Sequence, residues 1–200
     1  MQNMQAEHGR LLPVIARDAI ANVVHIPRKK TAIFDETAPW LVEPGATFVT
    51  LMQNDELRGC IGTVHAHRSL LADIQLNAVS AALNDPRFPP LTRDDLNSIM
   101  IEISLLSTPQ RICFVDEKDA MAQLRVGIDG IVFEYGHFRS TFLPQVWETL
   151  AQPQQFVAAL KLKAGLPGDF WDEDVKLSRY TITKWHETDL TEDYQNGRTN

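Results

Sequence analysis

Leu57-Arg58-Gly59-Cys60-Ile61-Gly62-Thr63 puts a guanidinium, a thiol and two glycines into a short run that otherwise has the composition of a β-strand. Thr47 to Met52, just before it, is rich in β-branched and aromatic residues. Gln53-Asn54-Asp55 between the two runs has the polar residues of a turn. The pattern predicts a β-hairpin whose second arm extends from Glu56 to Val64.

The segments on either side of this hairpin mix helical and strand patterns without a regular order. Apolar spacing predicts helices over residues 9–24, 70–84, 116–124, 144–150 and 153–164, with a short one from Thr92. Strand composition predicts further strands over residues 99–106, 111–115, 131–135, 138–143 and 175–185, the last at a sheet edge. Hairpins outnumber βαβ patterns, so we expect an α+β fold, a mainly antiparallel sheet with flanking helices.

Several local signals fix the ends of these elements. Residues 1–8 are expected to fray, and Pro13 fits a helix only in its first turn. Ser69 is a candidate N-cap, and Gly165 is a candidate helix stop. The proline-rich stretch from residue 25 to 46 predicts a long surface loop.

Composition narrows the class of protein. With 44% hydrophobic and 22% charged residues the chain is globular, and its two cysteines are too few for a disulfide framework. The formal charge of −7 makes nucleic-acid binding unlikely to be its function, because such binding depends on Lys and Arg neutralising phosphates. No apolar run is long enough to span a membrane, so we expect a cytoplasmic protein with reduced thiols. Neither a phosphate loop nor a dinucleotide glycine pattern occurs, so no cofactor is expected.

Five blocks of sequence give the chain a resemblance to a known family. They are residues 57–63, Asp85-Pro86-Arg87-Phe88-Pro89-Pro90-Leu91, Ile101-Glu102-Ile103-Ser104, Gly130-Ile131 with residues 141–146, and Lys163-Ala164-Gly165-Leu166. By these blocks the chain resembles the AMMECR-type domain family, which includes the prokaryotic AmmeMemoRadiSam system protein A. The resemblance covers roughly residues 10 to 187.

The resemblance implies an α+β fold with a larger and a smaller lobe, which we expect to surround a shared cleft. We expect one such domain over residues 1–189, and the composition after Asp189 predicts a polar tail at 190–200. It also implies association with a Memo-type protein and with a radical S-adenosylmethionine enzyme. The family has no settled reaction. Two positions depart from its pattern: Lys161 stands where a cysteine is usual, and Ser140 where a smaller residue is usual.

Cys60 is the sharpest candidate for chemistry. Arg58 nearby, or a nest of backbone N–H groups, would lower the pKa of the thiol and create a nucleophile. Gly59 and Gly62 are typical bulge residues, so Arg58 and Cys60 share a face only if the strand is regular. The alternative is that Cys60 is a small buried hydrophobic residue and that the glycines allow another backbone to approach.

Glu102 lies on the most apolar strand, where an unpaired carboxylate is costly, so it requires a cation; Arg58 and Arg87 are the candidates. A structural ion pair and a general acid or base are both open for Glu102. Asp85 is expected to bond the backbone in a turn, and convergence of Arg87 with Arg58 would favour an anionic ligand.

His65 and His67 have the spacing of two metal ligands on a strand, but the motif does not require them, and no metal site is predicted. The candidate catalytic residues are therefore Cys60 and Glu102. The candidate ligand-binding residues are Arg58, Gly59, Gly62, Asp85 and Arg87.

Two classes of function remain open. The first is a ligand-binding or catalytic domain whose cleft is centred on residues 57–63 and takes a small anionic or peptide ligand. The second is a non-enzymatic adaptor that docks a metalloenzyme through the loop from Arg28 to Trp40, which contains Arg28-Lys29-Lys30, or through the acidic C-terminal part.

Overall fold

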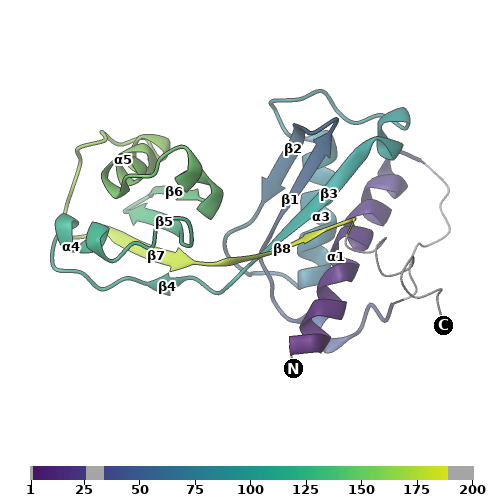
Figure 1. Ribbon diagram of the computed structural model, residues 1–200, viewed down its shortest axis with the longest axis horizontal. Helices are drawn as coiled ribbons and strands as arrows, with labels where there is room; N and C mark the ends of the chain where they lie inside the picture. Colours follow the sequence, from purple (N-terminus) through teal and green to yellow (C-terminus); the bar gives the residue numbers. More distant parts are fainter. Residues whose placement is uncertain (1, 26–33, 189–200) are drawn as a thin grey trace. The chain divides into compact units, whose positions relative to one another are not determined.

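The computed structural model describes residues 2–25 and 34–188, with the side chains of residues 2–7 left out (Figure 1). Its architecture is α+β, as the sequence predicts, and its strands form two antiparallel four-stranded sheets where one mainly antiparallel sheet was expected. The chain divides into two compact units. Unit 1 contains the described residues up to Leu106 and from Thr183 onward, and unit 2 contains Ser107–Ile182. The predicted tail at 190–200 and the basic Arg28-Lys29-Lys30 segment lie outside the described residues.

Unit 1 consists of one sheet and the helices that pack on it. Its helices are α1 Gln2–Val23, α2 Pro39–Val42, α3 Leu70–Leu83 and the 3-10 turn η1 Asp94–Asn97. Its strands are β1 Thr47–Gln53, β2 Glu56–Gly62, β3 Ile99–Leu106 and β8 Ile182–His186, in the order β2-β1-β3-β8.

The predicted hairpin is formed by β1 and β2. The turn that joins these strands consists of Asn54 and Asp55, whose φ angles are 53° and 62°. Positive φ at both central residues is what a type I′ hairpin turn requires. The pairing shifts register between Leu51 and Met52, since Leu51 lies opposite Gly59 and Met52 opposite Leu57. Arg58 is therefore the extra residue of a β-bulge.

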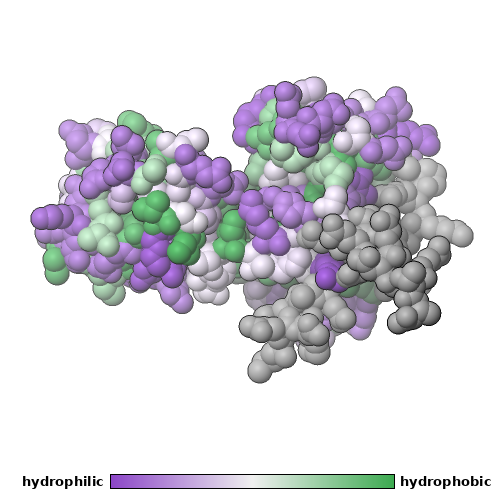
Figure 2. Space-filling view, viewed as in Figure 1, coloured by the Kyte–Doolittle hydropathy of each residue, from purple (hydrophilic) through white to green (hydrophobic). Residues whose placement is uncertain are grey.

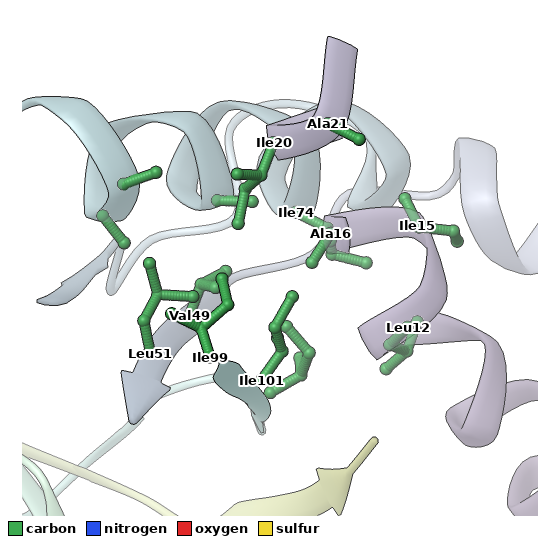
Figure 3. Packing of buried hydrophobic residues seen from close by; sticks show 14 of the residues in the cluster. Leu12, Ile15, Ala16, Ile20, Ala21, Val49, Leu51, Ile74, Ile99 and Ile101 are labelled. Carbon is green, nitrogen blue, oxygen red and sulfur yellow. The ribbon is translucent and has the colours of Figure 1, made fainter. Parts of the chain in front are cut away.

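Alternate residues of β1 and β3 face the two long helices of unit 1 (Figure 3). The buried side chains they contribute are Val49, Leu51, Ile99, Ile101 and Ile103, which pack with Leu12, Ile15 and Ile20 of α1 and with Ile74, Ala78 and Ala81 of α3. Period-two alternation puts the intervening residues on the opposite face of the sheet. We call that opposite face the outer face and place Thr50 and Glu102 on it.

α1 differs from the prediction at both its start and its interior. It begins at Gln2, where fraying was expected, and Pro13 lies within it and not in its first turn. Proline cannot donate to the carbonyl four residues earlier, and that residue is Gly9. The ring of Trp185 from β8 lies so close to Gly9 that a Cβ there would meet it at 2.0 Å. The absence of a side chain at Gly9 therefore allows Trp185 of β8 to pack against α1.

Unit 2 has a second sheet with strand order β4-β7-β5-β6. Its strands are β4 Gln110–Arg111, β5 Gly130–Tyr135, β6 Phe138–Phe142 and β7 Lys176–Tyr180, and its helices are α4 Glu117–Ala122, α5 Pro153–Ala164 and the 3-10 turn η2 Pro144–Glu148. Its core is separate from that of unit 1 and is built around Phe133, Trp147 and Phe156. The Trp147 and Phe156 rings stack at 3.7 Å.

Three predicted elements are changed in the structure. The strand predicted over 175–185 is two strands, β7 inside the second sheet and β8 in the first, separated by Thr181. The strand expected at 111–115 is only Gln110–Arg111. The helix expected from Pro144 is the 3-10 turn η2.

Hydrophilic residues cover most of the visible surface, and apolar residues show there as small separate patches (Figure 2). Among the described helices, none is long and apolar enough to cross a membrane.

Candidate functional site

A row of side chains crosses the outer face of the unit 1 sheet. Thr50 on β1 lies opposite Cys60 on β2 and opposite Glu102 on β3. Thr50 Oγ1 and Cys60 Sγ are 3.4 Å apart, a hydrogen bond in which either atom can donate. Residues directly opposite each other on neighbouring strands are close enough to interact. The sheet register therefore brings two of the predicted catalytic residues, Cys60 and Glu102, to either side of one threonine.

Glu102 is paired with two basic side chains from β8. Its carboxylate lies 2.9 Å from Lys184 Nζ and 3.6 Å from His186 Nε2. Of the two expected partners, Arg87 bonds Asp85, and Arg58 lies near Asp95. Sequence reasoning missed Lys184 and His186 because it treated the last strand as one edge strand and had no means of pairing it with Ile99–Leu106.

Asp85 and Arg87 form a clamp on the outer edge of β2. Asp85 Oδ2 accepts a hydrogen bond from the backbone N–H of Cys60 at 2.8 Å. Arg87 donates to both carboxylate oxygens, through Nε at 2.9 Å and Nη2 at 2.7 Å, and Nη2 also reaches the Cys60 carbonyl at 3.3 Å. The sequence predicts that Asp85 bonds the backbone in a turn, and Asp85 does accept from the Arg87 N–H at 3.2 Å. It does not predict that both side chains bond the backbone of Cys60. We refer to Asp85 and Arg87 as the clamp.

The clamp determines the charge state of its own carboxyl group. Hydrogen bonds from the Arg87 guanidinium, and then from backbone N–H groups, hold the pKa of Asp85 well below its usual range against the opposing effect of burial. The bond to Asp85 also raises the pKa of Arg87. The pair is therefore ionised at neutral pH, which makes its hydrogen bonds stronger than neutral ones.

The thiol of Cys60 is not activated by these neighbours. Burial raises its pKa above the ordinary value, and the Asp85 and Glu102 charges add to that effect. The Thr50 hydrogen bond and the Arg87 charge act in the opposite direction without reversing it. A protonated thiol is a poor nucleophile at neutral pH. This environment does not favour the nucleophilic role.

Arg58 does not join Cys60. As the bulge residue it departs from the alternation of β2, and the charge near it is the Asp95 carboxylate of η1. Hydrogen bonds from Thr92 lower the pKa of Asp95 most, and Arg58 contributes a smaller effect in the same direction. Arg58 Nη1 is buried without a hydrogen-bond partner among the described residues. Arg58 lies near Asp95, whereas Arg87 bonds Asp85 and Cys60, so the contacts of the two guanidinium groups do not bring them to one site.

Gly59 and Gly62 allow close approaches on opposite sides of β2. A Cβ on Gly59 would lie 2.2 Å from the carbonyl oxygen of Ala81, near the end of α3. A Cβ on Gly62 would lie 2.3 Å from the Phe48 ring. The glycines are thus explained by packing, as the alternative interpretation of the motif anticipates, and neither contact requires a ligand.

A buried polar network that sequence reasoning missed holds the other end of β2. Asp73 on α3 is fully buried and accepts hydrogen bonds from Thr47, Thr63 and Arg68 at 2.6–2.8 Å. Asn77, one turn later, donates to Asp73 at 2.9 Å. Ser69 caps this helix by accepting from Ala72, as predicted. An acidic residue in the first turn of a capped helix was the signal available in the sequence.

Within the described residues, no three His, Cys, Asp or Glu side chains gather in a way that could hold a metal ion. His67 Nδ1 lies 2.7 Å from the carbonyl oxygen of His65, so this ring is engaged with its own turn.

The fold and this site define a class: an α+β protein with two four-stranded antiparallel sheets, in which an Asp-Pro-Arg turn holds the edge of a glycine-containing hairpin arm. The family model described as AMMECR1 matches residues 13–185, and the chain belongs to that family.

Relatives align over nearly the whole chain. Protein MJ0810 of Methanocaldococcus jannaschii is 35% identical over 198 residues, which cover 94% of each chain. A protein of Sulfolobus acidocaldarius is 35% identical over 191 residues, covering 90% of this chain and 82% of its own. The crystal structure of the uncharacterized protein PH0010 from Pyrococcus horikoshii matches with a TM-score of 0.79 and 32% identity, covering 90% of this chain and 91% of that one. These comparisons establish the family and the fold and leave the function open.

Proposed function

We propose that the outer face of the unit 1 sheet binds a small anionic or peptide ligand without forming a covalent bond to Cys60. The observation that carries this proposal is the unequal exposure of its charges. The cationic side chains are open: Arg87 is 53% exposed and Lys184 37%, and the His186 ring beside them is 51% exposed. The carboxylates are covered, with Asp85 2% and Glu102 16% exposed. A ligand approaching this face therefore meets positive charge first.

The row between these cations offers polar groups that suit recognition. Thr50 and Cys60 share one hydrogen bond and keep further donor and acceptor capacity. Neighbouring strands lie about 4.8 Å apart, so a ligand that reaches from the clamp to Lys184 crosses about 14 Å. An extended peptide with acidic side chains has a suitable length. Arg87 is already held by Asp85, which lowers the entropy lost when it binds an anion.

Binding can be tested by amide NMR of the labelled protein, titrated with an acetylated, amidated pentapeptide that alternates Glu and Ala. Shifts of the Thr50, Cys60 and Glu102 amides are expected, and they should weaken as salt is raised. The matched peptide with Lys in place of Glu should have little effect. Equal shifts from both peptides, or shifts confined to unit 2, would contradict the proposal.

The non-covalent part is tested by alkylating the native protein across pH, with Cys113→Ser used so that only Cys60 reports. The midpoint of the Cys60 rate profile should lie above that of a small-molecule thiol under the same conditions, because burial raises its pKa. A midpoint below that of the free thiol would identify an activated Cys60 and restore the catalytic interpretation.

The second candidate function is that of a non-enzymatic adaptor, and one specific feature favours it. Leu57, Met52 and Met100 lie opposite one another across β2, β1 and β3, and Leu57 and Met100 are 39% and 43% exposed. An exposed apolar group next to a polar row suits a protein partner. The partners proposed for this role are a Memo-type protein and a radical S-adenosylmethionine enzyme, as the family resemblance implies.

Binding to purified Memo-type protein, measured by calorimetry, tests the adaptor. Met100→Lys should weaken the complex at least tenfold, whereas Leu162→Lys, an equally conspicuous exposed apolar residue on unit 2, should leave it unchanged. Unchanged affinity in Met100→Lys, or no complex with the unmodified chain, would remove the outer face as the docking surface.

A further inference from the structure

β2 is the terminal strand of the unit 1 sheet, with β1 on one side. Its free edge presents the backbone groups that β1 does not use. Cys60 turns its N–H and its C=O away from β1, because the N–H bonds Asp85 and the C=O accepts from Arg87. By the period of the strand, Gly62 directs its backbone groups to the same edge. Such an edge can pair with another strand.

The clamp supplies what a neighbouring strand would supply. A paired residue offers one carbonyl acceptor and one N–H donor to the edge. Asp85 gives a carboxylate oxygen to the Cys60 N–H, and Arg87 gives a guanidinium N–H to the Cys60 carbonyl. The segment that carries the clamp continues through Pro89 and Pro90, which have no N–H and cannot extend a strand pairing.

The clamp is held firmly in place. Asp85 also accepts from the backbone N–H of Arg87 at 3.2 Å, and the Arg87 guanidinium lies 5.3 Å from the centre of the Phe88 ring. Leu91 donates to the Ala82 carbonyl at 2.8 Å, which fixes the far end of the segment to α3. The edge is therefore closed by groups that are already ordered.

We propose that the clamp keeps the β2 edge closed to strand addition, and that without it this edge pairs with the β2 edge of a second copy of the chain. Two features of the edge select a second copy as the occupant. Gly59-Cys60-Ile61-Gly62 carries no charge, so two copies can approach without like-charge repulsion although the chain as a whole has a formal charge of −7. Two of its four residues are glycines, and Gly-rich strands are prone to alternate pairings.

The bulge at Arg58 limits the register of this pairing. The regular part of the edge begins at Gly59. An antiparallel pair that uses both outward residues puts Cys60 of each copy opposite Gly62 of the other, with two pairs of backbone hydrogen bonds. The amide of Gly62 then gains a partner that it does not receive from the clamp.

The test compares two double variants of the full chain by sedimentation over a range of concentrations. Asp85→Ala with Arg87→Ala removes the clamp. Arg125→Ala with Asp129→Ala removes a matched pair on unit 2, in which Arg125 is 51% exposed and Asp129 is fully buried. Neither double variant changes the net charge. The single variant Arg87→Ala keeps Asp85, the more buried residue of the clamp. It replaces the clamp double variant in the test if that double variant does not fold.

The clamp variant is expected to approach twice the wild-type mass as concentration rises, and the exchange of its Gly62 amide should slow at least tenfold. Arg87→Ala should show a smaller increase in mass. The wild type and the unit 2 variant should keep one mass over the same range. The proposal is overturned if folded Arg87→Ala and the double clamp variant both keep the wild-type mass. Equal association of the unit 2 variant, or association without slower Gly62 exchange, overturns it as well.

Discussion

Asp85→Asn should lower the free energy of unfolding of unit 1 by about 2–4 kcal/mol at neutral pH. Asp85 is 4% exposed and its two oxygens accept from Cys60 and Arg87. An asparagine amide presents hydrogens at one of these two positions, so a donor there loses its acceptor. A buried backbone N–H left unpaired costs about 1–3 kcal/mol, and a bond to a charged group contributes about 1.5–3 kcal/mol. The expected loss of about 2–4 kcal/mol is smaller than the sum of these two contributions, because the exposed Arg87 guanidinium regains hydrogen bonds to water in the variant.

The dependence on pH gives this prediction a second check. The pKa of Asp85 is lowered in the folded protein, so its contribution is present in full above the unfolded value of about 3.9. It is lost as pH falls from there toward the folded pKa. The difference in unfolding free energy between wild type and Asp85→Asn should thus be constant near neutral pH and shrink below about pH 4.

Urea unfolding at several pH values provides the measurement, followed by amide exchange of the peptide that contains residues 57–63. Asp35→Asn is the control, since the Asp35 side chain is exposed and, among the described residues, accepts hydrogen bonds from Thr37 of its own turn. It should change the unfolding free energy by less than about 0.5 kcal/mol. A loss below about 1 kcal/mol in Asp85→Asn, or a difference that grows as the solution is acidified, would refute the clamp's part in stability.

Two further substitutions test packing and buried charge by the same urea measurements. Gly59→Ala should cost about 1–3 kcal/mol, because its Cβ would meet the Ala81 carbonyl oxygen at 2.2 Å. Gly168→Ala is the control and should cost less than about 1 kcal/mol, because the nearest described atom would lie 3.5 Å from its Cβ. Equal costs in the two variants would contradict the close approach at Gly59. Lys161 is 1% exposed and donates to Glu117 at 2.6 Å and to the Phe170 carbonyl at 2.8 Å. Glu117→Ala should cost about 3 kcal/mol by removing the counter-charge of this buried ammonium, while Lys161→Met should be neutral or stabilising. The reverse order would refute this account.

Strands and helix caps that depend on only a few neighbouring residues were predicted well from local signals in the sequence. Ile99–Leu106 was predicted with its observed bounds, and Ser69 and Gly165 cap their helices as expected, Gly165 with φ at 91°. The last strand was predicted poorly for the opposite reason. Lys176–Tyr180 and Ile182–His186 have similar composition, and only their pairing partners assign them to different sheets.

The candidate site shows the same division between local and long-range information. The Asp85–Arg87 turn is local and was predicted, whereas its contact with the hairpin arm depends on long-range packing and was not. Whether Arg58 shares a face with Cys60 was left open, because a bulge depends on the count of residues in both strands, which one strand alone does not reveal. Glu102 was correctly expected to need a cation, but Lys184 comes from a strand whose position in the sheet no pattern in the sequence specified.

These structural roles decide which experiments on residues 57–63 can report on chemistry. Gly59 admits the Ala81 carbonyl, Cys60 offers its backbone to the clamp, and Arg58 forms the bulge. A substitution that disturbs any of these contacts will lower activity by disturbing the fold, whatever the reaction. Cys60→Ser keeps the backbone bonds and a hydroxyl near Thr50, so it removes the sulfur and little else. Loss of a cellular activity in Cys60→Ser, with the unfolding free energy unchanged, would therefore point to the thiol in a way that no glycine or arginine variant of this motif can.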